Sequence, residues 1–365
     1  MKSFKRIFSF IILLSVLITS LLCFTACKEE YVMSLDDGKY KLDMDVYEWL
    51  VSFCKTEEYN VFVQNLTAAG EDLALYDLTS YEFWSNSYGD SEFTLAEIVR
   101  DEAVVVGKSY LVAEKLFDEY GLTMTEDDID AIEGSIEQVD ESLQSGGTTL
   151  KEYLARYDIT ESTYKKVLTY QYKTQKLLSK LLAPGGRYEV TDKMVRDAYH
   201  DTVDAFGYSN VNHVFLYSVT FESDGSVKEL PEEDYLKIKA RAEEIYDAIL
   251  SGEAEFEDFL EYSDDKYSPD GYLVNIDTQM TETFVEAAIK MEVGDIKLIE
   301  SEGIGFHIIK KYDITPAQKT EIEDTIKSEL EAVAEDKILD IYFDDVSVDD
   351  EKINAVDPVY AKLLV

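Results

Sequence analysis

Two of the chain's three histidines lie inside short apolar segments of the kind that form buried β-strands. His213 belongs to residues 212–216 (NHVFL), and His307 belongs to residues 306–309 (FHII). Because such runs are typical of strands inside a sheet, we expect the two to pair at the centre of a small α/β domain. A histidine in this setting is more often a hydrogen-bonded core residue than a catalytic group, so both interpretations are open from the residues alone.

The segments between the two histidine strands predict the elements that would position them. In chain order they are a helix from Pro231 to about Gly252, a short helix over residues 256–260, an Asp-rich loop over residues 263–271, a helix capped by Thr281, and a Gly-Asp turn at residues 294–295. Proline in a first helical turn and glycine just after a last one are common helix boundaries. A single strand is expected over residues 212–220.

Residues 44–206 are expected to be all-helical, and residues 28–43 before them are expected to form a tether or a short hairpin. Apolar residues recur at helical spacing in segments near 44–66, 95–120, 125–143, 160–181 and 191–205, and residues 184–186 (PGG) interrupt them. After the second histidine strand, Thr315-Pro316 with Gln318 predicts the start of a long helix. We expect this helix to pack back on the N-terminal helices, and we expect the last residues to be a loosely attached tail.

The charge of the chain excludes one large class of partners. There are 34 Lys and Arg residues against 76 Asp and Glu residues, which gives a formal net charge of −42. Such a surface repels the phosphates of nucleic acids and the head groups of anionic lipids, so nucleic-acid binding is not expected. Any attachment to a membrane must come from something other than charge.

The N-terminus has the layout of a secretory signal. Residues 2–6 carry positive charge, residues 7–24 are almost continuously apolar, and Ala26-Cys27 is followed at once by polar residues. A small residue before a cysteine at this place resembles a bacterial lipobox, in which Cys27 would be lipidated. The alternative is an uncleaved transmembrane anchor. In either case the body of the protein is expected on the extracytoplasmic face of the cell membrane.

Several common chemistries have no support in the sequence. Cys54 is left without a cysteine partner if Cys23 and Cys27 belong to the leader, and its apolar neighbours indicate a buried thiol. There is no nucleophile elbow, phosphate-binding loop, dinucleotide fingerprint or HExxH motif. Neither a metal site nor a cofactor is expected.

Residues 209–313 resemble the parvulin (rotamase) family of peptidyl-prolyl isomerases. The matching features, in order, are residues 212–215 (NHVF), 252–259 (GEAEFEDF), 262–265 (YSDD), Gln279-Met280 with Phe284, residues 293–295 (VGD), and residues 305–310 (GFHIIK). Together with the leader and the helical region, the whole chain resembles PrsA-type foldase lipoproteins, and its layout is similar to that of SurA-type chaperones.

The resemblance implies a fold and a site. The fold class would be α+β, with a small antiparallel sheet and three to four helices inserted into an all-helical, chaperone-like domain. The proposed catalytic residues are His213 and His307, which would bond to each other, and Asp265, which would act on the amide. Met280, Phe284 and Leu273 would line the proline pocket. The alternative is a purely structural role, in which the histidines, Met280 and Phe284 are core residues and Asp265 is one of several carboxylates in an acidic loop.

The family's turn Gly-Gly-x-Leu-Gly is here residues 270–274 (DGYLV), so Val274 replaces its last glycine. The implied domains are a signal peptide (1–26), a lipidated cysteine and tether (27–43), a helical domain (44–208), a parvulin-like domain (209–313), a returning helix (314–345) and a tail (346–365).

Three functions are compatible with the predicted domains and site residues. The first is an extracytoplasmic, lipid-anchored isomerase that assists the folding of exported polypeptides containing X-Pro bonds. The second is a holdase chaperone whose parvulin-like domain has lost turnover, which the altered turn would favour. The third, more distant, is a structural adaptor lipoprotein with one fixed partner. A homodimer is left open.

Overall fold

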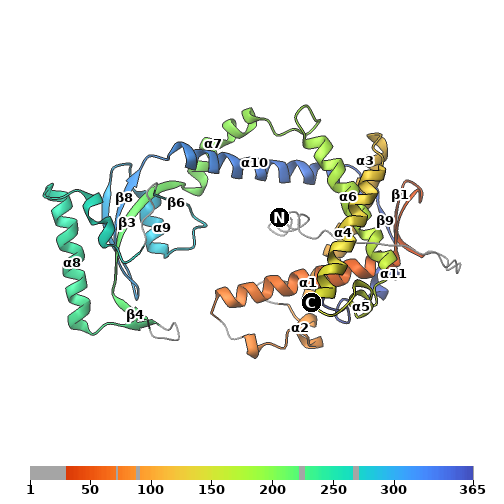
Figure 1. Cartoon of the computed structure of the whole chain (residues 1–365), viewed down its shortest axis with the longest axis horizontal. Helices are drawn as coiled ribbons and strands as arrows, with labels where there is room; N and C mark the ends of the chain where they lie inside the picture. Colours follow the sequence, from red (N-terminus) through yellow and green to blue (C-terminus); the bar gives the residue numbers. More distant parts are fainter. Residues whose placement is uncertain (1–29, 71–72, 88–90, 222–226, 266–270, 365) are drawn as a thin grey trace. The chain divides into compact units, whose positions relative to one another are not determined.

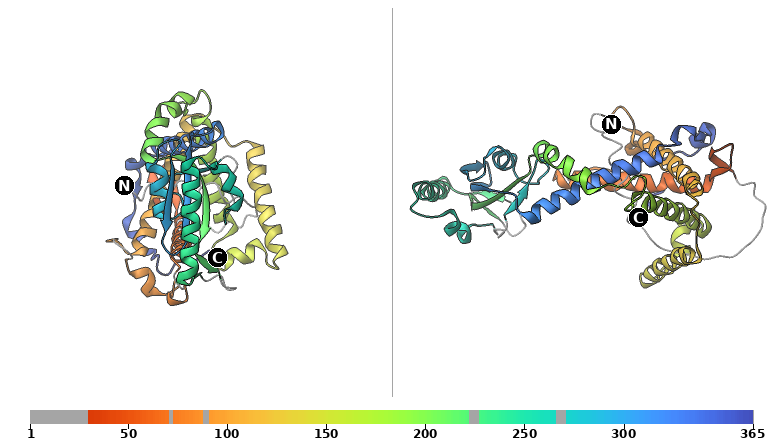
Figure 2. Two further views of the ribbon diagram at one scale, coloured as in Figure 1. Left: turned by 90° about the vertical axis from the view of Figure 1, so that its left-hand side faces the viewer. Right: turned by 90° about the horizontal axis from the view of Figure 1, so that it is seen from above.

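The computed structural model describes residues 30–70, 73–87, 91–221, 227–265 and 271–364. These residues form two compact units, which are treated separately below. The helical unit comprises the described residues up to Glu189 and those from Glu331 onward, and the histidine unit is Val190–Leu330. The expected leader and the expected lipidation site, Cys27, lie outside the described residues. Figures 1 and 2 show the elements coloured along the chain.

The helical unit begins with a hairpin. Strand β1 (Tyr31–Leu35) pairs antiparallel with β2 (Tyr40–Asp43), so residues 28–43 form the hairpin rather than the tether over their described part. The turn between the strands contains Gly38 at a φ of 81°, in a backbone region that glycine adopts without strain. The hairpin packs on the helices through Met33 and Leu42, which are fully buried.

The last described residues are part of this unit's core. Strand β9 (Ser347–Val348) pairs with β1 to give the sheet order β2-β1-β9, and α11 (Asp350–Ala355) buries Ile353. After α11, the backbone carbonyls of Val359 and Ala361 accept hydrogen bonds from the side chain of Lys55 on α1. The expected loosely attached tail is therefore wrong for these residues. A two-residue strand and an extended segment have no periodicity that a sequence pattern could reveal.

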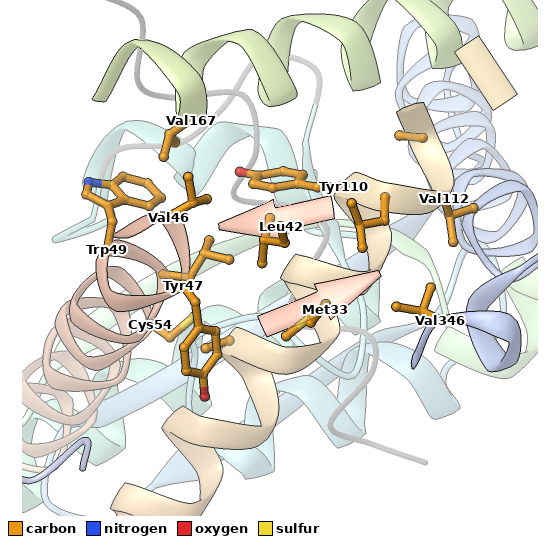
Figure 3. Packing of buried hydrophobic residues seen from close by; sticks show 14 of the residues in the cluster. Met33, Leu42, Val46, Tyr47, Trp49, Cys54, Tyr110, Val112, Val167 and Val346 are labelled. Atoms are coloured by element: carbon orange, nitrogen blue, oxygen red, sulfur yellow. The ribbon is translucent and has the colours of Figure 1, made fainter. Parts of the chain in front are cut away.

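Three long helices form the core of the helical unit. They are α1 (Met44–Ala68), α3 (Leu95–Glu119) and α6 (Glu161–Leu182), close to the predicted ranges. Figure 3 shows side chains of α1, α3, α6 and the small sheet converging in one apolar cluster. Cys54 is a buried free thiol in this cluster, as expected, and burial raises its pKa.

Shorter elements complete the helical unit. They are η3 (Leu73–Leu75), α2 (Tyr81–Ser85), α4 (Glu126–Ser145), α5 (Leu150–Ala155) and η5 (Phe343–Asp345). Thr125 caps α4 as predicted, because its hydroxyl accepts the backbone N–H of Asp128. None of the helices within the described residues combines the length and apolar character that a membrane crossing requires.

The histidine unit is built on a four-stranded antiparallel sheet of order β6-β3-β8-β7. Its strands are β3 (Ser209–Tyr217), β6 (Tyr272–Val274), β7 (Ile296–Ser301) and β8 (Gly305–Tyr312). The predicted strand over residues 212–220 is interrupted at Ser218, whose N–H donates to Ile304 O. Beyond this break, β4 (Val219–Phe221) forms a separate two-stranded sheet with β5 (Val227–Glu229), which the sequence pattern did not indicate.

Helices cover the two faces of this sheet. On one face α8 (Glu232–Ser251) and η4 (Phe256–Tyr262) pack on Val214, Leu216, Phe306 and Ile308. On the other face α9 (Glu282–Lys290) packs on Val211 and Ile309. Because alternate strand residues share a face, His213 and His307 lie on the α9 side.

The histidine unit also contains α7 (Asp192–Phe206) and the first part of α10 (Pro316–Leu339). Val190 and Val195 pack there with Ile322 and Ile326. The compact unit therefore starts at Val190 rather than at residue 209. The returning helix was expected to pack on the N-terminal helices, but only its end, with Ile338 and Leu339, lies in the core of the helical unit. The fold as a whole is α+β, as predicted.

Candidate active site

The pairing of β3 with β8 brings the two histidines together. In the register His213 is opposite Ile309 and Phe215 is opposite His307, so the imidazoles lie diagonally on one face. Their Nδ1 atoms are 2.9 Å apart, and the ring planes differ by 7°. The predicted strand pairing is thus confirmed, and a direct hydrogen bond joins the two rings.

Burial keeps both histidines neutral near pH 7. His213 is 2% exposed and His307 is 4% exposed. Burial lowers the pKa of His213, against an opposing effect of the Asp265 carboxylate. The pKa of His307 is lowered to about 3, chiefly by burial and secondly by the neighbouring His213. A charged imidazole would lose its hydration here, so the neutral form is favoured.

A loop after η4 brings Asp265 to this pair. Phe215 N donates to Ser263 Oγ at 2.9 Å, Asp264 N donates to Phe215 O at 2.8 Å, and Tyr217 N donates to Asp264 Oδ2 at 2.8 Å. The loop is thereby fixed along the edge of β3, beyond the end of β6. Asp265 Oδ2 then lies 3.4 Å from His213 Nε2, a charge–dipole contact whose geometry does not make it a hydrogen bond.

These contacts determine where the protons lie. A carboxylate is negatively charged and only accepts, so Asp265 at 3.4 Å favours the tautomer of neutral His213 with its proton on Nε2. His213 Nδ1 must then accept, and His307 Nδ1–H must donate to it. The second nitrogen of His307, Nε2, is buried and has no hydrogen-bond partner among the described residues. One hydrogen bond thus joins the two rings, and His213 Nε2–H faces Asp265 in an electrostatic contact of 3.4 Å.

Phe284 and Met280 lie beside the histidines. The Phe284 ring is fully buried, and its centroid is 5.1 Å from that of each imidazole, with the rings edge to face. Met280 is half-buried in the same cluster, just before α9. Thr281 is the N-cap residue of α9, as expected, but its hydroxyl bonds Ser301 Oγ at 2.8 Å rather than a backbone N–H of the helix. Met280 is the more accessible of the two apolar residues.

Leu273 is not brought to this group. It packs with Val195 and Ile322 in the α7/α10 cluster, while its neighbour Tyr272 contacts His213 with ring centroids 5.5 Å apart. Consecutive strand residues face opposite sides of a sheet, so the predicted wall was misplaced by one position. Tyr272 occupies the position that was assigned to Leu273.

The altered turn is accommodated by the fold. Gly271 has a φ of 81°, and a Cβ atom at this residue would lie 2.1 Å from Asn210 Oδ1, so glycine is required. Asn210 is held by bonds to Asp313 O and from Gln318 Nε2. Val274, which replaces the last glycine of the turn, is fully buried and pairs with β3 at Ser209. The replacement is therefore a core residue of β6.

Sequence reasoning missed three aromatic side chains near the histidines. Phe215 stacks on His307 with centroids 4.3 Å apart, Tyr217 contacts Phe215 at 4.5 Å, and Tyr272 contacts His213. A usable signal was present in β3, where His213, Phe215 and Tyr217 alternate and therefore share a face. No cluster of three His, Cys, Asp or Glu residues within the described part is close enough to hold a metal ion.

A comparison with protein families matches residues 226–313 to the family described as "Rotamase: PPIC-type PPIASE domain". The matched residues include Asp265, Met280, Phe284 and His307, and they begin after β3, which carries His213. No curated protein matches the chain.

Among solved structures, peptidylprolyl isomerase PrsA from Bacillus cereus is 20% identical, and the match covers 75% of this chain and 91% of that chain with a TM-score of 0.29. PrsA from Bacillus subtilis is 21% identical, with 75% and 92% covered and a TM-score of 0.24. Foldase protein PrsA from Streptococcus pneumoniae is 15% identical, with 75% and 98% covered and a TM-score of 0.31.

The family match therefore confirms the resemblance seen in the sequence motifs. The histidine unit contains a PPIC-type, or parvulin-type, peptidyl-prolyl isomerase domain.

Proposed function

We propose that the histidine unit catalyses cis-trans isomerisation of peptide bonds before proline in exported, incompletely folded polypeptides. Amide resonance sets a rotation barrier of ~18–20 kcal/mol, so the uncatalysed exchange is slow enough to limit folding. No covalent intermediate is needed. A catalyst has only to hold the proline and favour the twisted amide over the planar one.

The roles of the residues follow from this requirement. Met280, with Phe284 beneath it, provides the apolar surface for the proline ring. Asp265 would lie beside the carbonyl of the preceding residue. Amide resonance places partial negative charge on that oxygen, so a nearby carboxylate disfavours the planar, resonance-stabilised form. The neutral histidine pair would act as a positioning element, because the hydrogen bond from His307 orients the His213 ring and His213 Nε2–H faces the Asp265 carboxylate at 3.4 Å.

The observation that carries this proposal is the row of His307, His213 and Asp265 over Phe284, in which a hydrogen bond joins the two imidazoles and Asp265 Oδ2 lies 3.4 Å from His213 Nε2. It lies in a domain that matches the PPIC type. The arrangement uses two buried imidazoles to orient a half-exposed carboxylate. Such an arrangement is costly to fold and has no evident structural benefit that apolar residues would not supply.

The location rests on the sequence of residues 1–27. A signal with a cysteine after a small residue supports an N-terminal lipid anchor on Cys27 at the extracytoplasmic face of the membrane. In this setting the helical unit would bind emerging polypeptides close to the isomerase. A Cys27→Ala variant should be released from the membrane fraction if lipid is the anchor. Retention of that variant would favour the uncleaved transmembrane anchor.

A holdase without turnover is the second candidate. The observation that favours it is Val274, because this residue replaces a glycine of the family's turn at one side of the site. The two functions differ in one measurable quantity, the rate of isomerisation.

The proposal is tested by two-dimensional NMR exchange on an X-Pro peptide with the full-length protein. We expect exchange well above the spontaneous rate, and a loss of at least about tenfold in Asp265→Ala. Asp247→Ala is the matched control, because Asp247 is an exposed carboxylate on α8. Met280→Ala should also reduce the rate. Spontaneous exchange with the unmodified protein would reject the isomerase, and equal rates in both Asp variants would reject the role of Asp265.

A further inference from the structure

A continuous series of aromatic rings leads from the histidine pair to the surface. Phe215 stacks on His307 at a centroid distance of 4.3 Å, Tyr217 meets Phe215 at 4.5 Å, and Phe221 meets Tyr217 at 5.1 Å. The last two contacts are edge to face, with interplanar angles of 72° and 85°. This geometry is the favourable one for aromatic pairs.

The series ends in an exposed apolar pair. Phe221 is 56% exposed, and its register partner on β5, Val227, is 57% exposed. The β4–β5 hairpin thus holds both side chains in water rather than in a core. Exposed aromatic surface that is continuous with a candidate active site is a common mark of a ligand contact.

The direction of the series relative to the proposed chemistry is defined by the loop contacts. Tyr217 N donates to Asp264 Oδ2, and the next residue in the loop is Asp265. Phe284 lies against both imidazoles, and Met280 and Phe284 pack in one cluster with Val211, toward the start of β3. Along β3 the order is therefore apolar pocket, Asp265, and then Tyr217 with Phe221.

We infer that Tyr217 and Phe221, with Val227, receive the side chain of the substrate residue immediately before the proline and favour an aromatic one. This inference rests on the proposed isomerase function. With the proline ring on Met280, the carbonyl beside Asp265 belongs to that preceding residue. Its side chain therefore projects toward the ring series. An aromatic side chain can form the same edge-to-face contacts with Phe221 that Tyr217 already forms.

The test uses two peptide series with the full-length protein. In one series the residue before proline is Phe, Tyr, Leu or Ala, and in the other the residue after proline is varied in the same way. Rates are measured by NMR exchange, so no coupling protease adds its own preference. We expect kcat/KM to favour Phe over Leu before proline by about two- to tenfold, and we expect no such preference after proline.

Variants assign the preference to the ring. Phe221→Ser should reduce the Phe-to-Leu ratio to below about twofold, and Phe221→Tyr should retain it. Phe93→Ser is the matched control, because Phe93 is 57% exposed and lies in the helical unit. The inference is overturned if there is no aromatic preference, if the preference follows the residue after proline, or if it survives Phe221→Ser.

Failure of the proposed function is distinguishable from failure of this inference. If no peptide is turned over at all, the isomerase is rejected, and the dissociation constants of the same peptides decide about the ring series. A tighter Phe-Pro peptide whose advantage disappears in Phe221→Ser supports it. Equal dissociation constants for the Phe-Pro and Leu-Pro peptides overturn it.

Discussion

The two units of the molecule both bury titratable groups, but with opposite consequences. In the helical unit Glu102 has a raised pKa, first because it is buried and then because Glu58 lies beside it, and burial likewise raises the pKa of Glu335 to about 7. In the histidine unit burial lowers the pKa of both His213 and His307. Burial favours the uncharged form in each case, which means a bound proton for an acid and a lost proton for a base.

This difference predicts opposite responses of the two units to pH. As pH rises from about 5 to 8, unfolded carboxyls release protons that the native helical unit retains, so its stability falls. As pH falls below 6.5, unfolded histidines take up protons that the buried native imidazoles bind only at lower pH, near 3 for His307, so the stability of the histidine unit falls. Both tryptophans, Trp49 and Trp84, belong to the helical unit, so tryptophan fluorescence reports on that unit alone.

The largest expected effect is that of Phe284→Ala. Removal of this fully buried ring should destabilise the histidine unit by ~3–5 kcal/mol and strongly reduce isomerisation. In urea titrations, the transition seen by tryptophan fluorescence should not move, while part of the far-UV circular dichroism signal is lost earlier. An equal shift of both signals would show that the two units unfold together, which would contradict separate stabilities for the two units.

The next effect is the acid destabilisation of the histidine unit. Its free energy of unfolding should fall by up to about 1.4 kcal/mol per pH unit through His307 as pH decreases from 6.5 toward 3, and the lowered pKa of His213 adds to this slope. A His307→Asn variant removes one of the two groups, and its slope should be less steep. NMR signals of the sheet residues during urea titration provide the measurement. An unchanged slope in His307→Asn would contradict the assignment of this pH dependence to the pair.

Glu102→Gln is expected to have a smaller effect, and it should increase the stability of the helical unit at high pH rather than decrease it. The amide needs no bound proton to remain neutral, so the variant should lose part of the decline in stability between pH 5 and 8. The expected change is on the order of 1 kcal/mol at pH 8. The fluorescence transition measures it, and Glu137→Gln on the exposed side of α4 is the matched control. If both variants follow the unmodified protein, burial of Glu102 does not cause the decline.

The smallest expected effect is local. Lys55 is 3% exposed and donates at 2.8 Å to both Val359 O and Ala361 O, and it lies 4.7 Å from the Trp84 ring centroid. Lys55→Met should cost ~1–2 kcal/mol in the helical unit only. Amide exchange in residues 357–364 should accelerate. Unchanged exchange there would mean that apolar packing alone holds this segment.

The site was easier to predict from sequence than the boundaries of the units. His213 and His307 come together as expected, because the alternation in β3 and β8 fixes which side chains share a face, and bonds of residues 263–264 to β3 bring Asp265 beside them. The prediction for Leu273 was wrong because β6 has only three residues, too few for an alternating pattern to show which side chains face the core. The true limit of the histidine unit at Val190 depends on the packing of α7 against α10. Such contacts leave no local pattern. The anchor at Cys27 stays a prediction.

The central claim is that this molecule accelerates prolyl isomerisation in a folding polypeptide, rather than only preventing aggregation. The most direct measurement is the slow, proline-limited refolding phase of a client protein at increasing concentrations of the full-length chain. We predict that the rate constant of this phase rises with concentration, and that it rises much less with Asp265→Ala. A higher refolded yield with an unchanged rate constant would contradict the isomerase and leave the holdase as the function.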